Sequence, residues 1–253
     1  LLASQAHRCD AMLANSESVA ADARRRFGAA VPVDTLYNSV DLERFNPDGP
    51  RADLDALAGL PPPAPGAIRI GLVATFARWK GHGVFLDALA KLRGRANVRG
   101  YIIGGPIYHT DASQYSQAQL RERAESLGLG DTVGFTGKVD DVSAVLRALD
   151  IAVHASTEPE PFGLVIAEAM ACGRPVVISR AGGAAEIAQG GALFHEPGNS
   201  EELADRLREL AVDPAQRASL GAEGRGAAVR LFSRARLRDT LIPVYESLAG
   251  VTR

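Results

Sequence analysis

Two glutamates close together in the sequence have the side chains and the spacing to bind a ligand with hydroxyl groups. Glu160 and Glu168 are separated by seven residues in the segment PEPFGLVIAE, where a loop containing Pro and Gly is predicted to enter a helix. Ionised carboxylates accept hydrogen bonds from neighbouring hydroxyls. The backbone N–H groups of Phe162, Gly163 and Leu164 would lie at the helix N-terminus, which favours an anion. Carboxylates for hydroxyls beside amides for phosphate indicate a sugar nucleotide.

The composition limits the classes of function. The chain has 253 residues, of which 46% are apolar, so it can bury a substantial core. Its formal net charge of −2 gives no reason to expect general binding to nucleic acid. Cys9 and Cys172 are too few for a disulfide framework, and the apolar run before Cys172 favours a core thiol. The sequence has neither an apolar stretch of transmembrane length nor a secretory signal, which predicts a cytoplasmic protein. Peripheral association with the inner membrane face is left open.

Apolar strands alternate with helices along most of the chain. Strands are predicted at residues 68–74, 98–105, 132–137, 150–156 and 175–179, and helices at 81–92, 140–150, before Leu127 and before Gly173. This alternation predicts an α/β fold, a Rossmann-like parallel sheet with helices on both faces. Ligands bind beyond the carboxyl ends of such strands. The loops expected to converge there are 75–80, 104–106, 137–139, 157–163 and 180–183.

The N-terminal segment has two interpretations. The chain starts at Leu1 and Leu2 in a helix-like stretch without an initiator Met, and residues 11–16 are predicted as a buried strand followed by a helix through Arg26. This segment is either a short subdomain of its own or the end of a larger N-terminal domain. We favour the second interpretation and expect most of an N-terminal domain to be absent.

Several motifs in register resemble those of one family. Residues 160–163 are EPFG, 168–171 are EAMA, 79–82 are WKGH and 38–47 are NSVDLERFNP. They resemble the acidic pair, the basic phosphate loop and the interdomain segment of retaining GT-B glycosyltransferases (glycosyl transferases group 1, glycosyltransferase family 4). Relatives usually have Gly at the position of Ser39. The resemblance covers nearly the whole chain and implies the C-terminal, donor-binding half of a GT-B fold.

The same resemblance implies four parts of the chain. Residues 1–37 would be a remnant of the N-terminal acceptor domain, and 38–50 the interdomain linker. Residues 51–232 would form the domain that binds the nucleotide sugar, and 233–253 a helix that crosses back to the N-terminal domain.

The C-terminal segment 233–248 is predicted as an amphipathic helix broken at Pro243. In a chain without the N-terminal domain its apolar residues would be partly exposed, and packing on the chain's own core is the alternative. These residues are Leu237, Leu241, Val244, Tyr245 and Leu248.

The resemblance assigns roles to the charged residues. It implies that Glu160 contacts hydroxyls of the donor sugar and Glu168 the ribose hydroxyls, whereas the alternative is a helix-terminal charge and a solvated side chain. Lys80 and Arg78 would neutralise the diphosphate leaving group, unless they are surface charges. Many relatives carry a phosphate-binding Arg at the position of Thr75, so Arg78 would reach the phosphate from a different place.

Backbone groups complete the expected donor site. Val139 resembles the position whose backbone contacts the nucleobase, and it also fits a core residue at a strand end. Gly104 and Gly105 allow a ligand to approach the backbone closely, or they serve the turn alone. His82, at a helix start, and His154, in a buried strand, are interpreted as packing or capping residues.

These observations predict a retaining glycosyltransferase that moves a sugar from a UDP- or GDP-linked donor to an acceptor hydroxyl of a glycan, glycolipid or cell-surface polysaccharide. Glu160 would position the sugar rather than attack it. No cofactor or metal is expected, because Asp140 and Asp141 are interpreted as helix caps. The N-terminal domain would supply the acceptor site, so the chain alone is expected to bind nucleotide but to transfer sugar poorly. The alternatives are a non-catalytic nucleotide-binding subunit of a split transferase and a sugar-nucleotide epimerase.

Overall fold

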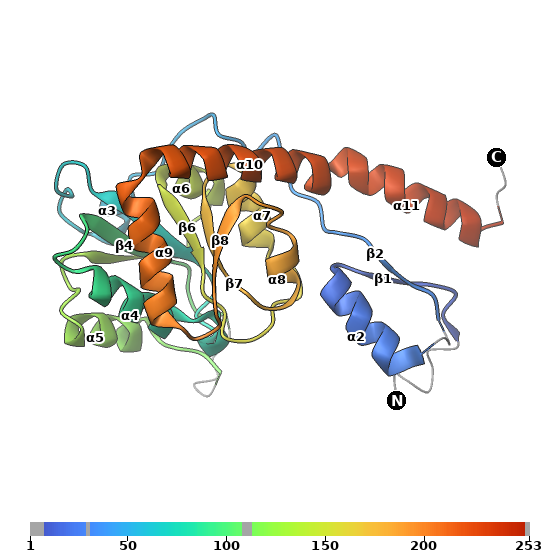
Figure 1. Cartoon of the computed structure of the whole chain (residues 1–253), viewed down its shortest axis with the longest axis horizontal. Helices are drawn as coiled ribbons and strands as arrows, with labels where there is room; N and C mark the ends of the chain where they lie inside the picture. The colour runs from blue at the N-terminus through green and yellow to red at the C-terminus, as the bar shows by residue number, and fades with distance from the viewer. Residues whose placement is uncertain (1–7, 29–30, 108–112, 251–253) are drawn as a thin grey trace.

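The main body of the computed structural model, which describes residues 8–28, 31–107 and 113–250, is a six-stranded sheet (Figure 1). Its strand order is β5-β4-β3-β6-β7-β8. The strands are β3 (Ile68–Val73), β4 (Val98–Ile103), β5 (Val133–Gly137), β6 (Ile151–His154), β7 (Val176–Ser179) and β8 (Ala192–His195). Every pairing between neighbours is parallel. The predicted α/β fold with a Rossmann-like parallel sheet is therefore confirmed.

Helices cover both faces of this sheet. On one face lie α4 (His82–Leu92), α5 (Gln117–Ser126) and α9 (Ser200–Val212). On the other lie α3 (Leu54–Ala58), α6 (Val142–Ala148), α7 (Leu164–Ala171), α8 (Gly182–Glu186) and α10 (Pro214–Phe232). Strand β4 serves both cores, because successive side chains of a strand point to opposite faces. Ile102 packs with the first group of helices, and Tyr101 and Ile103 pack with the second.

The sequence alone did not predict the elements between residues 180 and 232. Helix α10 shows why, because it buries small residues where a helix usually buries large ones. Gly221, Gly224, Ala227 and Ala228 are buried on it, and a Cβ atom on Gly221 would lie 2.4 Å from the carbonyl oxygen of Gly173. Such close packing leaves no strong stripe of large apolar residues in the sequence.

A small unit precedes the main sheet. Strands β1 (Met12–Ala14) and β2 (Val33–Thr35) pair in parallel beside α2 (Glu17–Phe27). The strand predicted at 11–16 exists, but it is short and not buried throughout, since Leu13 is 41% exposed. The Glu186 carboxylate accepts hydrogen bonds from the amides of Glu17 (2.7 Å) and Ser18 (3.0 Å), which ties α2 to α8. Leu1 and Leu2 lie outside the described residues.

The segment predicted as a linker, 38–50, packs on the main body. The amide of Val40 donates to the carbonyl of Phe232 at 2.7 Å, and the Arg147 guanidinium donates to the carbonyl of Pro50 at 2.8 Å. Val40 itself is buried. The boundaries of the four parts stay a prediction.

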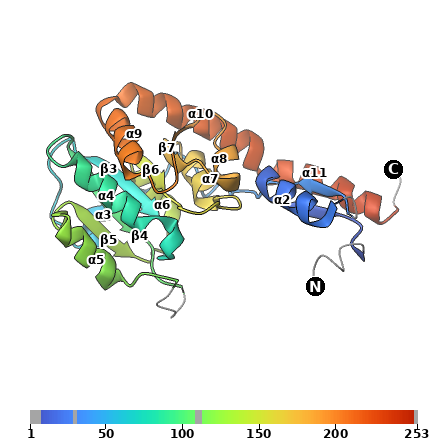
Figure 2. The same ribbon diagram turned by 60° about the horizontal axis from the view of Figure 1, so that its bottom comes forward.

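Helix α11 (Arg234–Leu248) extends away from the main body on the same side as the small unit (Figures 1 and 2). It runs continuously through Pro243, so the prediction of a broken helix was wrong. None of its residues is buried, which contradicts packing on the chain's own core and confirms the expected exposure. Tyr245 and Leu248 are 64% and 52% exposed. No helix in the described ranges is long and apolar enough to span a membrane.

Candidate functional site

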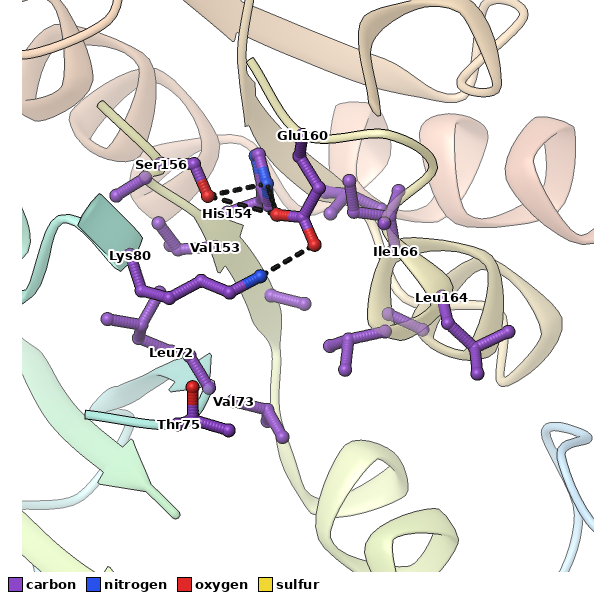
Figure 3. Close-up of a pocket in the computed structure, with 17 residues that line it drawn as sticks. Leu72, Val73, Thr75, Lys80, Val153, His154, Ser156, Glu160, Leu164 and Ile166 are labelled. Carbon is purple, nitrogen blue, oxygen red and sulfur yellow. Dashed lines mark hydrogen bonds and ion pairs between the residues drawn. The ribbon is translucent and has the colours of Figure 1, made fainter. Parts of the chain in front are cut away.

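A cavity lies where the strand order reverses, at the carboxyl ends of β3 and β6 (Figure 3). Its volume is about 170 Å³, and we call it the Lys80 cavity. In open parallel sheets such a reversal leaves a crevice in which ligands bind. Of the residues predicted from the sequence, the structure brings Thr75, Lys80, Glu160, Gly163 and Leu164 together in its lining.

A second cavity adjoins the first across the end of β3. This Val139 cavity has a volume of about 510 Å³ and is lined by Gly104, Gly105 and Val139, as predicted, together with Lys138. Both cavities share Thr75 and three apolar neighbours in their linings. The joined space is of the size expected for a nucleotide-sized ligand, with Lys80 and Glu160 in one part and Lys138 in the other.

Lys80 is held at the cavity by its own loop. Its ammonium group lies 4.1 Å from the centroid of the Trp79 ring and 2.6 Å from Oε1 of Glu160. The next residue, Gly81, has a φ of +74°, and a Cβ atom there would lie 1.8 Å from the carbonyl oxygen of Ala155. Only glycine allows this loop to approach the end of β6 so closely.

Replacing Gly81 by alanine is expected to lower the free energy of unfolding by about 3 kcal/mol or more, because both the backbone conformation and the contact with Ala155 become unfavourable. Urea unfolding measures the effect. Gly226→Ala is the matched control. Gly226 lies in α10 with nothing within 4 Å of its added methyl group, so this change should stabilise by up to about 1 kcal/mol. Equal changes in the free energy of unfolding for Gly81→Ala and Gly226→Ala would contradict the special requirement for glycine at position 81.

The Glu160 carboxylate is held from two sides. Oε1 accepts from Lys80 at 2.6 Å, and Oε2 contacts Nε2 of His154 at 2.6 Å and accepts from Oγ of Ser156 at 3.0 Å (Figure 3). Burial alone would raise the pKa of Glu160, but the hydrogen bond and charge of His154 and the charge of Lys80 outweigh it and lower the pKa to about 2. Glu160 is therefore ionised and can only accept hydrogen bonds.

The N-terminus of α7 opens into the same cavity. Gly163 caps the helix with a φ of +85°. Within the described part of the chain, no backbone acceptor faces the amides of Leu164 and Val165, so these N–H groups remain for a ligand. The buried ring of Phe162 packs edge-on against Phe232 at 5.5 Å and anchors this loop. The predicted role of its amide toward a ligand stays a prediction.

The sequence of this chain is similar to those of known glycosyltransferases. Residues 63–227 match the family model described as Glycosyl transferases group 1. The chain belongs to this family. The group 1 chain is also 36% identical over 203 residues to D-inositol 3-phosphate glycosyltransferase 2 of Catenulispora acidiphila, covering 75% of this chain and 46% of that protein. With the corresponding enzyme of Saccharomonospora viridis it shares 33% identity over 255 residues, 96% of this chain and 57% of that one. The chain thus spans about half the length of these curated relatives.

Solved structures agree with the family. HepE of Anabaena in complex with UDP and glucose superposes with a TM-score of 0.85 at 27% identity, over 97% of this group 1 chain and 65% of that one. The C-terminal domain of the group 1 protein LpcC of Francisella tularensis gives a TM-score of 0.64 at 26% identity, over 78% of this chain and all of that one. The predicted membership of the GT-B glycosyltransferases is confirmed.

Glu168 has a different environment from Glu160. Glu168 lies on α7, one turn after Leu164, and it lines neither cavity itself. Burial raises its pKa to about 7, and the charge of Arg44 lowers it only in part. In the described part of the molecule no donor is hydrogen-bonded to its carboxylate. The two glutamates therefore have the same chemistry but opposite pKa shifts.

Arg78 lies apart from the other predicted residues. It lines neither cavity, and its guanidinium carbon lies 4.4 Å from the centroid of the Tyr115 ring. Its role toward the diphosphate stays a prediction. Asp141 caps α6 by accepting from the amide of Ala144 at 3.1 Å, as expected. No cluster of three or more metal-binding side chains occurs within the described ranges.

The structure confirms the predicted packing role for one histidine and contradicts it for the other. His82 is a packing residue, as predicted: it is fully buried against the ring of Phe76, and burial lowers its pKa to about 4. The same interpretation was wrong for His154, which lines the Lys80 cavity and contacts Glu160. Sequence reasoning also missed Ser156. Residues two apart on a strand point to one side, so the pattern His-x-Ser just before Glu160 indicates that both share one side of the strand, but not which side.

Proposed function

We propose that the protein is a retaining glycosyltransferase that transfers a sugar from a UDP-linked donor to an acceptor hydroxyl. The observation that carries this proposal is the ion pair of Lys80 with Glu160 in the Lys80 cavity, which adjoins the Val139 cavity. A UDP donor is favoured over a GDP donor because HepE, a relative in fold, binds UDP and UDP-glucose.

Each part of the donor would have its own partner. The nucleobase occupies the Val139 cavity, and the diphosphate lies between Lys80 and the amides at the start of α7. When the glycosidic bond breaks, negative charge develops on the diphosphate, and a preorganised cation and backbone dipoles stabilise it without reorganisation. Glu160 accepts hydrogen bonds from sugar hydroxyls, and Glu168 accepts from the ribose. Because Lys80 already forms an ion pair with Glu160, the carboxylate serves for positioning rather than nucleophilic attack.

The acceptor would bind outside the two cavities. A hydroxyl of a glycan, glycolipid or cell-surface polysaccharide fits the expected reaction. The curated relatives are named for an inositol 3-phosphate, so we propose a phosphorylated polyol as a more specific acceptor class. We propose that acceptor recognition depends on a second domain, so that the chain alone binds the donor but transfers sugar poorly.

A thermal-shift panel with UDP, GDP and ADP tests the donor. A ligand that binds only the folded state at 100 times its Kd stabilises that state by about 2.7 kcal/mol. We expect UDP to raise the melting temperature by several degrees, and ADP to leave it nearly unchanged. A larger shift with GDP would correct the base, and no shift with any of the three would reject the proposed donor site.

A further inference from the structure

The contacts of His154 give it a function that the donor site described above does not use. We propose that His154 is a positioning residue, which keeps the Glu160 carboxylate in place for the sugar hydroxyls while Lys80 interacts with the diphosphate. The inference rests on the proposed function, because it requires a nucleotide sugar in the Lys80 cavity.

The carboxylate of Glu160 has two anchors of different kinds. Lys80 comes from the loop after β3 and is shared, because a bound diphosphate attracts the same ammonium group. His154 comes from β6, and Ser156 follows directly after that strand; both contact Oε2, at 2.6 and 3.0 Å. Neither is expected to leave Glu160 when an anion binds, so they hold one oxygen of the carboxylate throughout.

The sheet itself holds this second anchor. The backbone of His154 pairs with Ile178 of β7, and its carbonyl accepts from Nε2 of His195 on β8 at 3.3 Å. The carbonyl of Ser156 accepts from Oγ of Ser179 at 2.6 Å. The side chain of His154 is only 11% exposed. Its position is therefore set by three neighbouring strands and not by the loop that carries Glu160.

The ionised carboxylate of Glu160 also requires a proton on Nε2 of His154. An ionised carboxylate offers no proton, so Nε2 must donate to Oε2. Nδ1 is buried and has no hydrogen-bond partner in the described part of the chain. The ionisable groups around this ring are Glu160, Lys80 and His195. Nε2 also lies 2.9 Å from Oγ of Ser156. Its contact with Oε2 of Glu160 is the one through which His154 would act.

Two variants with amide side chains test whether the hydrogen bond from Nε2 matters or only the volume of the side chain. In His154→Gln the side-chain nitrogen can reach the position of Nε2, whereas in His154→Asn it ends near the position of Nδ1. The dissociation constants of UDP and UDP-glucose are measured by titration calorimetry for the wild-type chain and both variants. Ser156→Ala, which removes the neighbouring donor, provides a second variant in case His154→Asn does not fold.

In His154→Asn we expect UDP-glucose to bind about tenfold more weakly while UDP changes by less than about twofold, since only the sugar depends on the position of the Glu160 carboxylate. His154→Gln should restore the wild-type ratio of the dissociation constants of UDP-glucose and UDP. Ser156→Ala should raise this ratio by about threefold. An unchanged ratio, an equal loss for both ligands, or identical behaviour of the two amides would overturn the inference alone. If the wild type binds neither ligand, the proposed function fails with it.

Discussion

Replacing Lys80 by alanine is expected to weaken UDP binding by about 10- to 100-fold. Lys80 lines the Lys80 cavity, 2.6 Å from Glu160 and in contact with the Trp79 ring. A charge-assisted hydrogen bond of this kind contributes about 1.5–3 kcal/mol, and each 1.4 kcal/mol changes the dissociation constant tenfold. The variant also leaves the negative charge of Glu160 facing the diphosphate without its neutralising partner. Titration calorimetry with UDP measures the loss.

Lys91→Ala is the matched control for this prediction. Lys91 also forms an ion pair with a glutamate, Glu201 at 2.5 Å, but it lies on the surface of α4 and lines neither cavity. Its removal should leave the dissociation constant of UDP unchanged within about twofold. Unchanged UDP binding by Lys80→Ala, in a variant that still unfolds cooperatively, would show that the diphosphate lies elsewhere.

The two glutamates are expected to respond in opposite directions when each is replaced by glutamine in the ligand-free protein. The folded-state pKa of Glu160 lies near 2, below its ordinary value of 4.5, so its ionised form stabilises the fold above pH 4.5 and this stabilisation is lost as the pH falls toward 2. The pKa of Glu168 lies near 7, so the fold loses stability as the pH rises from 4.5 to 7. At pH 8, Glu160→Gln should destabilise by about 2–3 kcal/mol and Glu168→Gln should stabilise by about 1–2 kcal/mol.

Urea unfolding at pH 8 and pH 5 measures both effects. The gain from Glu168→Gln should shrink at pH 5, where Glu168 is largely protonated in the folded state and the cost of burying its charge disappears. The same variant should bind UDP more weakly at pH 8, because a neutral amide accepts hydrogen bonds from ribose hydroxyls less strongly than a carboxylate. A loss of stability in both variants would contradict the opposite environments of the two side chains.

Much of this site could be predicted from the sequence, because it depends on local patterns. The segment EPFG entering a helix placed Glu160, Gly163 and Leu164 correctly, and the alternation of strands and helices brought the loop of Lys80 to the same edge of the sheet. Gly104 was expected from the end of a strand, and it lines the adjoining cavity.

The remaining features depend on contacts between distant segments. The side chain of His154 could point into the core or toward the ligand, and only the register of β6 between β3 and β7 decides. Arg78 has a long side chain next to Lys80 in sequence, yet it stacks on Tyr115, which lies 37 residues further along the chain. Neither outcome follows from composition or spacing, since both depend on the direction that one side chain takes in three dimensions.

A crystal structure of the chain with UDP tests the central claim most directly. We expect the uracil in the Val139 cavity and the ribose hydroxyls within hydrogen-bond distance of Glu168. The diphosphate should lie between Lys80 and the amides of Leu164 and Val165. A nucleotide bound away from Lys80 and the start of α7, or no bound nucleotide at millimolar UDP, would contradict it.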